Sequence, residues 1–331
     1  MMARRINLIA RDNGVGLSRD LQLLAEALRT GDCDVTVTGI RRGKLTKWLR
    51  PWARRGEWMM RRLLQGRRAA THDVNVMLEH VWPDDAPFAH TNVLIPNPEW
   101  LLPRDRQRLH RVDRILAKTH HAQVLFEDLG KTVDYVGFTS VDRLLPGVPR
   151  DRRFFHLAGR SRSKGTERLL ALWRQHPEWP GLTVVQSPHN AQPGEPAANI
   201  DHLVGYMDDA TLQELQNSHW FHVCPSETEG YGHYLTEAMS VGAVVITLDA
   251  PPMNELVPPD CGLLVPPSVK TGRQHLATTY FFDDRAMEAA VEQAMAMDEE
   301  TLQQMGDRAR AQFLASGASF APRLLRVIEA L

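Results

Sequence analysis

SETEGYGHYLTEAMSVGA, residues 226–243, holds two carboxylates eight positions apart, Glu229 and Glu237. The glycine-flanked turn Gly230-Tyr231-Gly232 separates them. From His233 onward, apolar residues recur at helical spacing, which predicts a helix. We therefore expect Glu229 on a loop and Glu237 about one turn into the helix, with both side chains facing the same crevice.

The chemistry of this stretch favours a ligand that combines phosphate with hydroxyl groups. Backbone amides of residues 230–233, at a turn and a helix N-terminus, suit an anion such as phosphate. Glu229 can then accept hydrogen bonds from sugar hydroxyls, and Glu237 from a ribose diol. The spacing alone is equally consistent with a surface turn that carries two solvated glutamates.

The longer sequence HWFHVCPSETEGYGHYLTEAMSVGAVVITLDAPPMNELVPPDCGLLVPP, residues 219–267, resembles the C-terminal domain of family 4 glycosyltransferases. Its Pro-Ser strand end, Glu-x7-Glu, Glu-Ala-Met, Glu-Leu-Val and Gly-Leu-Leu-Val-Pro follow the order of the family pattern. The resemblance is close from about residue 154 onward and loose before it. It implies the GT-B architecture, an α/β fold of two Rossmann-like domains facing each other across a cleft. It also implies retention of configuration at the anomeric carbon and no metal requirement.

A second motif lies at the start of the C-terminal half. A strand at 154–158 precedes the loop 159–165, GRSRSKG, and a helix follows. Two cations on a glycine-bounded strand-to-helix loop suit a diphosphate, Arg160 through its fork geometry and Lys164 as a point charge. The family resemblance implies that both residues bind the donor pyrophosphate. With Glu229, they are the predicted catalytic residues.

Other donor contacts are predicted from loops at strand ends. Gly14 and Gly16 follow a strand at Ile6–Ala10, and a lone Gly-x-Gly there is weak evidence for nucleotide binding. The two glycines match the family's glycines beneath donor and acceptor, although they could equally serve only the turn. Tyr206 and Met207 lie on a loop that usually holds the nucleotide base in the resembled family.

The acceptor-side candidates follow two buried strands of the N-terminal half. Glu79 and His80 end the first of them, and the ends of parallel strands face the crevice where ligands bind. The second strand ends near Asn97 and Glu99. Many family 4 enzymes place a histidine there, so this departure leaves the group at the reacting carbon unassigned.

Composition limits the class of protein. A chain of 331 residues predicts two domains, and 43% hydrophobic with 24% charged residues is ordinary for a globular protein. Three cysteines without metal spacing suit a reducing cytoplasm. The basic start has too short an apolar core for a signal peptide, and no stretch approaches the length of a membrane span. We expect a cytoplasmic protein, with peripheral attachment at the inner membrane face as one possibility.

The predicted division of the chain follows the pattern breaks. Pro146-Gly147-Val148-Pro149 and the charged residues after it predict an interdomain hinge. We expect residues 1–147 to form an acceptor-side Rossmann-like domain and residues 152–315 a nucleotide-sugar-binding one. A C-terminal helix, residues 316–331, is expected to return to the N-terminal domain.

The charge is concentrated in one segment. Residues 41–68, the basic segment, hold eleven Lys or Arg and one acidic residue, so they carry about +10 and the remainder about −11 of the net −1. The segment also carries three tryptophans and has Pro51 and Gly56 within its helical pattern. Three readings stay open: an anionic membrane surface, nucleic acid or another polyanion, or two short helices whose apolar residues pack on the first domain.

The predicted function is transfer of a sugar from a nucleoside-diphosphate sugar to an acceptor hydroxyl, without metal or cofactor. The acceptor would be a glycan or glycolipid, such as a membrane-associated polysaccharide precursor, and no protein partner is implied. The aspartate pairs Asp84-Asp85 and Asp283-Asp284 are predicted as turns, not metal ligands. The alternatives are a transferase for modified nucleic acid, epimerisation of a sugar nucleotide, and a non-catalytic anion-binding protein of the same fold.

Overall fold

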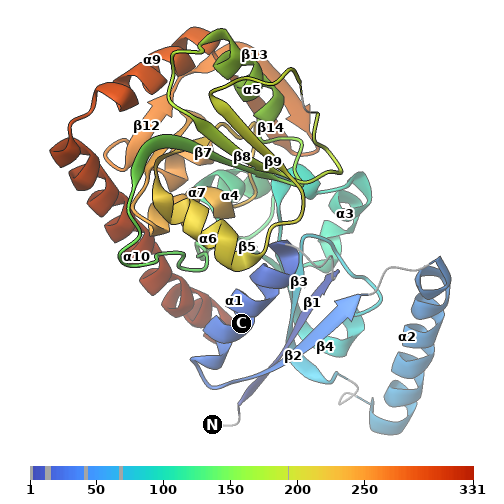
Figure 1. The fold of residues 1–331 in the computed structure, drawn as a ribbon. Helices are drawn as coiled ribbons and strands as arrows, with labels where there is room; N and C mark the ends of the chain where they lie inside the picture. The colour runs from blue at the N-terminus through green and yellow to red at the C-terminus, as the bar shows by residue number, and fades with distance from the viewer. Residues whose placement is uncertain (1–2, 12–15, 41–43, 67–69, 193) are drawn as a thin grey trace. The chain divides into compact units, whose positions relative to one another are not determined.

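The computed structural model describes residues 3–11, 16–40, 44–66, 70–192 and 194–331 (Figure 1). The chain forms two compact units: unit 1 comprises Met1–Phe138 and Ala318–Leu331, and unit 2 comprises Thr139–Gly317. Within the described residues, each unit holds a parallel six-stranded sheet. Unit 2 adds a small antiparallel hairpin. These are the two α/β domains that the sequence predicts.

Unit 1 has the following elements in chain order: β1 (Arg4–Arg11), α1 (Gly16–Arg29), β2 (Cys33–Ile40), α2 (Lys44–Gln65), β3 (His72–Leu78), η2 (Ala86–Phe88), β4 (Ala89–Ile95), η3 (Pro98–Trp100), α3 (Pro103–Arg108), η4 (Leu109–Arg111), β5 (Arg114–Ala117), α4 (His120–Glu127) and β6 (Val133–Tyr135).

Unit 2 continues with β7 (Asp151–Gly159), α5 (Thr166–Gln175), β8 (Leu182–Gln186), β9 (Ile200–Val204), α6 (Asp209–Ser218), β10 (His219–Cys224), α7 (His233–Ser240), β11 (Val244–Leu248), α8 (Met253–Leu256), β12 (Gly262–Val265), β13 (Pro267–Gln274), β14 (Ala277–Phe282), α9 (Asp284–Ala296) and α10 (Glu299–Glu329).

The strand order of each sheet shows where its chain path reverses. Unit 1 has the order β2-β1-β3-β4-β5-β6, so β2 lies on one side of β1 and β3 on the other. The chain path therefore reverses at β1. Unit 2 has the order β12-β11-β10-β7-β8-β9, which places the reversal between β7 and β10. In open parallel sheets, ligands bind beyond the carboxyl ends of the strands at such a switch point. Each unit therefore has one topologically favoured binding edge.

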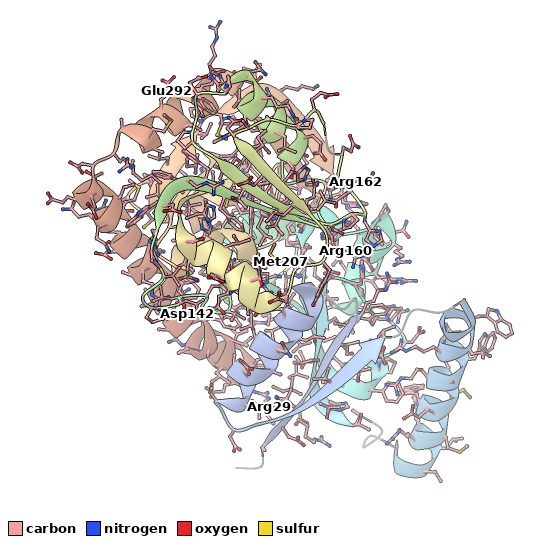
Figure 2. The ribbon with its side chains drawn as sticks, in the orientation of Figure 1. Arg29, Asp142, Arg160, Arg162, Met207 and Glu292 are labelled. Carbon is pink, nitrogen blue, oxygen red and sulfur yellow. The ribbon has the colours of Figure 1, made fainter. Side chains whose placement is uncertain are left out.

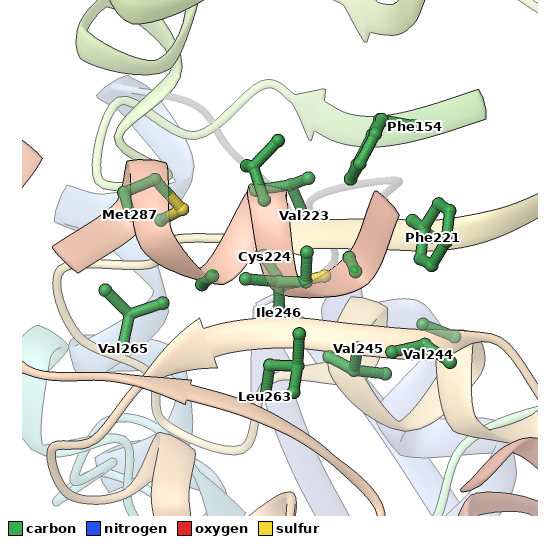
Figure 3. Packing of buried hydrophobic residues seen from close by; sticks show 14 of the residues in the cluster. Phe154, Phe221, Val223, Cys224, Val244, Val245, Ile246, Leu263, Val265 and Met287 are labelled. Carbon is green, nitrogen blue, oxygen red and sulfur yellow. The ribbon is translucent and has the colours of Figure 1, made fainter. Parts of the chain in front are cut away.

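The core of unit 2 explains why its central strands are almost continuously apolar. Both faces of β10 and β11 are covered, so residues on both faces are buried, as is usual for parallel strands. Figure 3 shows the side chains of Phe154 and Phe221 close together, and their rings stack with centroids 4.7 Å apart. Met287 of α9 packs in the same cluster (Figure 3).

The boundary between the units lies earlier than the predicted hinge, at Phe138/Thr139. The reason is that residues 139–149 bond to unit 2 side chains. Arg143 binds Asp209, and the Leu145 amide donates to Asn217 Oδ1 at 2.8 Å. A Pro-Gly turn marks flexible chain in sequence, but these long-range bonds determine which unit the chain belongs to.

The C-terminal helix is continuous with the one before it. Residues 316–331 do not form a separate helix, because α10 runs from Glu299 to Glu329 with Pro322 inside it. Residues from Ala318 onward belong to unit 1, where Leu325 packs against Gly31 and Phe320 against Phe138. The last turns of α10 thus complete the core of the N-terminal unit.

The basic segment contains one long helix, α2, not two short ones. Pro51 removes one backbone hydrogen bond, yet the helix continues through it and through Gly56. Two of its tryptophans, Trp48 and Trp52, and the leucines Leu49, Leu63 and Leu64 do not pack on unit 1 but are exposed, which contradicts the packed reading of the segment. Asp85 is also not a surface turn residue, because it is fully buried and binds Arg50 and Arg54 of this helix.

A buried ion pair joins α1 to the end of β5 in unit 1. Lys118 Nζ lies 2.8 Å from Asp20 Oδ2, and both side chains are almost fully buried. We expect Lys118→Ala to lower the free energy of unfolding by about 3–5 kcal/mol, because it removes the buried cation that lies against the Asp20 carboxylate. Urea unfolding measures this loss.

Arg5→Ala is the matched control, since its ion pair with Asp73 is largely exposed. We expect that change to cost less than about 1 kcal/mol. Equal losses for Lys118→Ala and Arg5→Ala would show that burial does not set the strength of the Lys118 pair.

Candidate functional site

The predicted catalytic pair meets at the switch point of unit 2. Lys164 lies on the loop after β7 and Glu229 on the loop after β10, the two strands between which the chain path reverses. Lys164 Nζ and Glu229 Oε1 form an ion pair, and both side chains are largely buried. The sequence predicts each residue separately, and the structure brings them into contact.

Backbone contacts hold the two loops in register. The Glu227 amide donates to the Ser163 carbonyl at 2.9 Å, and the Glu227 carbonyl accepts from the Tyr280 amide of β14 at 2.8 Å. Gly165 has a φ of +66° and packs so closely on Pro225 that a Cβ would lie 2.7 Å from its carbonyl oxygen. Only glycine fits there without strain.

Tyr234 and Ser226 complete the surroundings of the ion pair. Lys164 Nζ lies 3.4 Å from the centroid of the Tyr234 ring, a cation–π contact. The Ser226 hydroxyl donates to Glu229 Oε1 and also bonds to the Tyr234 hydroxyl. Burial raises the pKa of the Tyr234 phenol well above its usual value, so it stays neutral. The ion pair is thus held from several sides by neighbouring side chains.

Arg160 differs from Lys164 in its environment. It lies on the same loop but is exposed, and Figure 2 shows its side chain and that of Arg162 at the surface of unit 2. Within the described part of the chain, no ion pair or hydrogen bond engages the Arg160 guanidinium. An anion that binds this loop could therefore contact Lys164, which is held in its ion pair, and Arg160, whose exposed side chain is free to change conformation.

The start of α7 has the geometry that the glycine turn predicts. Gly230, Tyr231 and Gly232 are buried, and Gly232 caps the helix with a φ of +82°. A Cβ at Gly232 would lie 2.8 Å from the side chain of Leu235, so the position requires glycine. The first-turn amides of a helix lack intrahelical acceptors and carry its positive dipole end, which favours an anion there.

His233 is held by a bond to Ser140, which lies in the segment between β6 and β7. Its Nδ1 lies 2.7 Å from the Ser140 hydroxyl, which also bonds to the Thr236 hydroxyl at 2.6 Å. Ser140 therefore anchors the first turn of α7.

Glu237 sits in a buried polar network. Its carboxylate accepts a hydrogen bond from Gln216 Nε2 at 3.3 Å, and Gln216 Oε1 accepts one from Arg143 Nε at 2.8 Å. The Arg143 guanidinium also makes a two-pronged ion pair with Asp209, with both distances 2.9 Å. Burial of a carboxylate requires such partners, and here they fix the position of Glu237 on α7.

Two further side chains shape the loop edges. His156 of β7 bonds to the Val223 carbonyl through Nδ1 at 2.8 Å and to the Thr166 hydroxyl through Nε2 at 2.9 Å. Because a carbonyl only accepts, Nδ1 carries the proton. Asn190 donates from Nδ2 to the Ser161 carbonyl at 2.7 Å, which ties the proline-rich loop after β8 to the Arg160 loop.

The predicted base-pocket residues lie after β9. Tyr206 is almost fully exposed, and Met207, which is labelled in Figure 2, is half-buried. Nearby, Asn190 Oδ1 is a buried acceptor with no hydrogen-bond partner in the described part of the chain. Whether Tyr206 and Met207 contact a base stays a prediction.

The acceptor-side candidates form a cluster at the carboxyl ends of β3 and β4. Asn97 Nδ2 donates to Glu79 Oε1 at 3.2 Å, and the Glu79 amide donates to the Ile95 carbonyl at 2.9 Å. Glu79 has a φ of +60°, a strained value for a non-glycine residue that is frequent at functional sites. Glu99, two residues after Asn97 in the sequence, is also buried.

His80 has a different role from the others. Its ring bonds through Nδ1 to Asp105 Oδ2 at 2.9 Å, and both residues are buried. It therefore holds α3 to the end of β3. Of the predicted glycines, Gly14 lies outside the described residues, and Gly16 is the first residue of α1.

Sequence reasoning missed several residues that position the site: Ser140, Arg143, His156, Asn190 and Gln216. None lies in a recognisable motif. Among the residues described, no three or more His, Cys, Asp or Glu side chains lie close enough together to hold a metal ion.

Comparison with known proteins gives the class. Residues 197–312 match the family described as glycosyl transferases group 1, a range that includes the loop of Glu229 and all of α7. No curated protein is significantly similar to the chain in sequence. The chain therefore carries a region that matches the group 1 glycosyl transferases, and this region spans about a third of its length.

Solved structures give the fold of the whole chain. Sucrose-phosphate synthase of Thermosynechococcus elongatus is 16% identical, with a TM-score of 0.71 over 99% of this chain and 98% of that one. A glycosyltransferase of Rickettsia africae is 12% identical, with a TM-score of 0.70 over 100% and 98%. Anabaena Alr3699/HepE, solved with UDP and glucose, is 13% identical, with a TM-score of 0.66 over 99% and 100%. The architecture is that of the GT-B glycosyltransferases.

The buried histidines of unit 2 predict a loss of stability in acid. Burial lowers the pKa of His156 from 6.5 to about 4 and that of His222 to about 3. Between these values and 6.5 the unfolded chain binds more protons than the folded one, so the free energy of unfolding falls as the pH falls. Each histidine contributes up to about 1.4 kcal/mol per pH unit.

Chemical unfolding of His156→Gln between about pH 7 and about pH 5 should therefore show a shallower pH dependence than the wild type. His189→Gln replaces an exposed histidine of the same unit and should leave the dependence unchanged. The assignment of His156 fails if the His156→Gln and wild-type curves run parallel.

Proposed function

We propose that the protein is a retaining, metal-independent glycosyltransferase that moves a sugar from a nucleoside-diphosphate sugar to an acceptor hydroxyl. The observation that carries the proposal is the Lys164–Glu229 ion pair at the switch point of unit 2, beside the capped start of α7. Positive and negative groups fixed together at one strand edge suit a ligand that has both a diphosphate and sugar hydroxyls.

In this mechanism, cleavage of the sugar–phosphate bond places negative charge on the leaving diphosphate. Lys164, Arg160 and the first amides of α7 would stabilise that charge. Glu229 would accept hydrogen bonds from donor-sugar hydroxyls and Glu237 from the ribose, which fixes the geometry of the reacting carbon. The leaving phosphate oxygen can take the acceptor proton on the same face, so retention needs no protein base. The cations supply the charge neutralisation that a metal would otherwise give.

The acceptor we propose is a glycolipid or polysaccharide precursor at the cytoplasmic face of a membrane. The exposed tryptophans of α2, interleaved with arginines, support this choice over a small dissolved acceptor. None of the described helices is long and apolar enough to cross a bilayer, so attachment would be peripheral. Glu79, with its positive φ at the end of β3, and Asn97, at the end of β4, are the proposed acceptor contacts.

The test is the thermal midpoint of the purified protein with nucleoside diphosphates and their sugars. UDP and UDP-glucose come first, since Alr3699/HepE was solved with UDP and glucose. We expect a rise in the midpoint with one base family, because a ligand that binds only the folded state stabilises it. Arg160→Ala and Glu237→Gln should lose most of that rise.

Arg285→Ala is the control, since it removes an exposed arginine of α9 from the same unit. It should keep the full shift. Transfer to acceptor and hydrolysis of the donor are then measured with the responding nucleotide sugar. No shift with any nucleotide would sink the proposal. Conversion of the nucleotide sugar to its epimer in the absence of an acceptor would show that the reaction is epimerisation and not transfer.

A further inference from the structure

Helix α2 is attached to unit 1 by its charged face. Arg50 Nη2 lies 2.6 Å from Asp85 Oδ2, and Arg54 Nη2 lies 3.0 Å from Asp85 Oδ1. The Arg54 guanidinium also lies 3.6 Å from the centroid of the Phe88 ring. Asp85 is fully buried, so two arginines neutralise one carboxylate that has no access to water. This clamp fixes how the helix is rotated about its own axis.

The opposite face of α2 is apolar and points into solvent. Trp48, Trp52 and Leu63 are 70%, 66% and 82% exposed, and Met59, Met60 and Leu64 are exposed beside them. Positions 48, 52, 59 and 63 share one face of a helix, and the arginine positions 50, 54 and 61 lie about 200° away from it. A surface helix normally turns its apolar stripe toward the core. Here the arrangement is reversed, and Figure 1 shows α2 at the margin of unit 1, beyond the sheet.

Basic side chains border this apolar face. Arg55 and Arg62 are exposed and lie about 50–70° from its centre, and Arg62 stacks over the Trp58 ring with its guanidinium 5.0 Å from the centroid. The segment from 41 to 68 as a whole carries about +10. Such a helix matches the boundary between acyl chains and anionic headgroups, where tryptophan and arginine are both favoured.

We propose that the outward face of α2 binds the surface of an anionic phospholipid bilayer. Trp48, Trp52 and Leu63 enter the acyl boundary, while Arg55 and Arg62 bind lipid phosphates. Asp85 acts as a positioning residue, because its clamp presents the apolar face outward. This deepens the proposed function by assigning the residues that would bring the enzyme to a membrane-borne acceptor.

Two other occupants fit the observations less well. A polyanion such as nucleic acid would meet methionine and leucine side chains, because Arg50 and Arg54 are engaged with Asp85 and Arg61 with Glu57. A second copy of the chain would bring two strongly positive segments together, and like charges repel. Anionic lipid is the occupant that satisfies both the apolar and the basic side chains.

The test is co-sedimentation of the full-length protein with vesicles of phosphatidylglycerol and phosphatidylcholine, compared with phosphatidylcholine alone. We expect binding to the anionic vesicles only, with weakening as salt is raised. The double variant Trp48→Gln/Trp52→Gln should lower the partition coefficient by about tenfold or more. Trp100→Gln, which replaces a half-exposed tryptophan elsewhere in unit 1, should leave it unchanged.

Circular dichroism and the nucleotide-induced thermal shift establish that each variant is folded. Absence of binding to anionic vesicles overturns the proposal, as does equal binding by the double variant. So does binding to heparin that survives the double substitution while vesicle binding is absent, which assigns the segment to polyanions. A dimer in light scattering that the double variant abolishes would overturn it in favour of self-association. Because nucleotide binding is measured separately, a negative vesicle result leaves the donor proposal standing.

Discussion

The ion pair between Lys164 and Glu229 is the contact on which the arrangement of the candidate site depends. It joins the loops that follow β7 and β10, the two strands between which the chain path of unit 2 reverses. Neither charge would be stable alone at this burial, so each requires the other. The contact also requires Gly165, because only a residue without a Cβ lets the loop after β7 lie against Pro225. A diphosphate arriving here would compete with Glu229 for a cation that is already in place.

Behind this charged edge, the supporting groups are neutral or fully paired. His156 links β7, the start of α5 and the end of β10 through its two ring nitrogens, and burial keeps it uncharged. Gln216 plays the same part beneath α7, since its amide bonds to Glu237 on one side and Arg143 on the other. The loops that carry exposed charge therefore rest on side chains whose own charge state does not change near neutral pH. That separation lets a charged ligand bind without disturbing the core.

The parts of the site that lie within one continuous stretch could be predicted from the sequence. The turn 230–232, the start of α7 and the cationic loop 159–165 all follow from local spacing and glycine chemistry, as do the two parallel sheets. Gln216 and Arg143 could not be predicted, because they are 73 positions apart and meet only through packing. The predicted hinge rests on a Pro-Gly turn, which is a local signal, whereas the bonds that Arg143 makes within unit 2 join residues far apart in the sequence.

Helix α2 shows what amphipathic periodicity can predict about a helix and what it cannot. The pattern of residues 44–65 indicates a helix with one apolar face, but a period does not say which face meets the protein. Asp85 determines which face of α2 meets unit 1. The sequence context predicts Asp85 as a turn residue, and the fold buries it completely. Once buried, the carboxylate requires cations, and α2 supplies two of them from its polar side. Docking the arginines turns the tryptophans outward, so the exposed apolar face is a consequence of satisfying one buried charge.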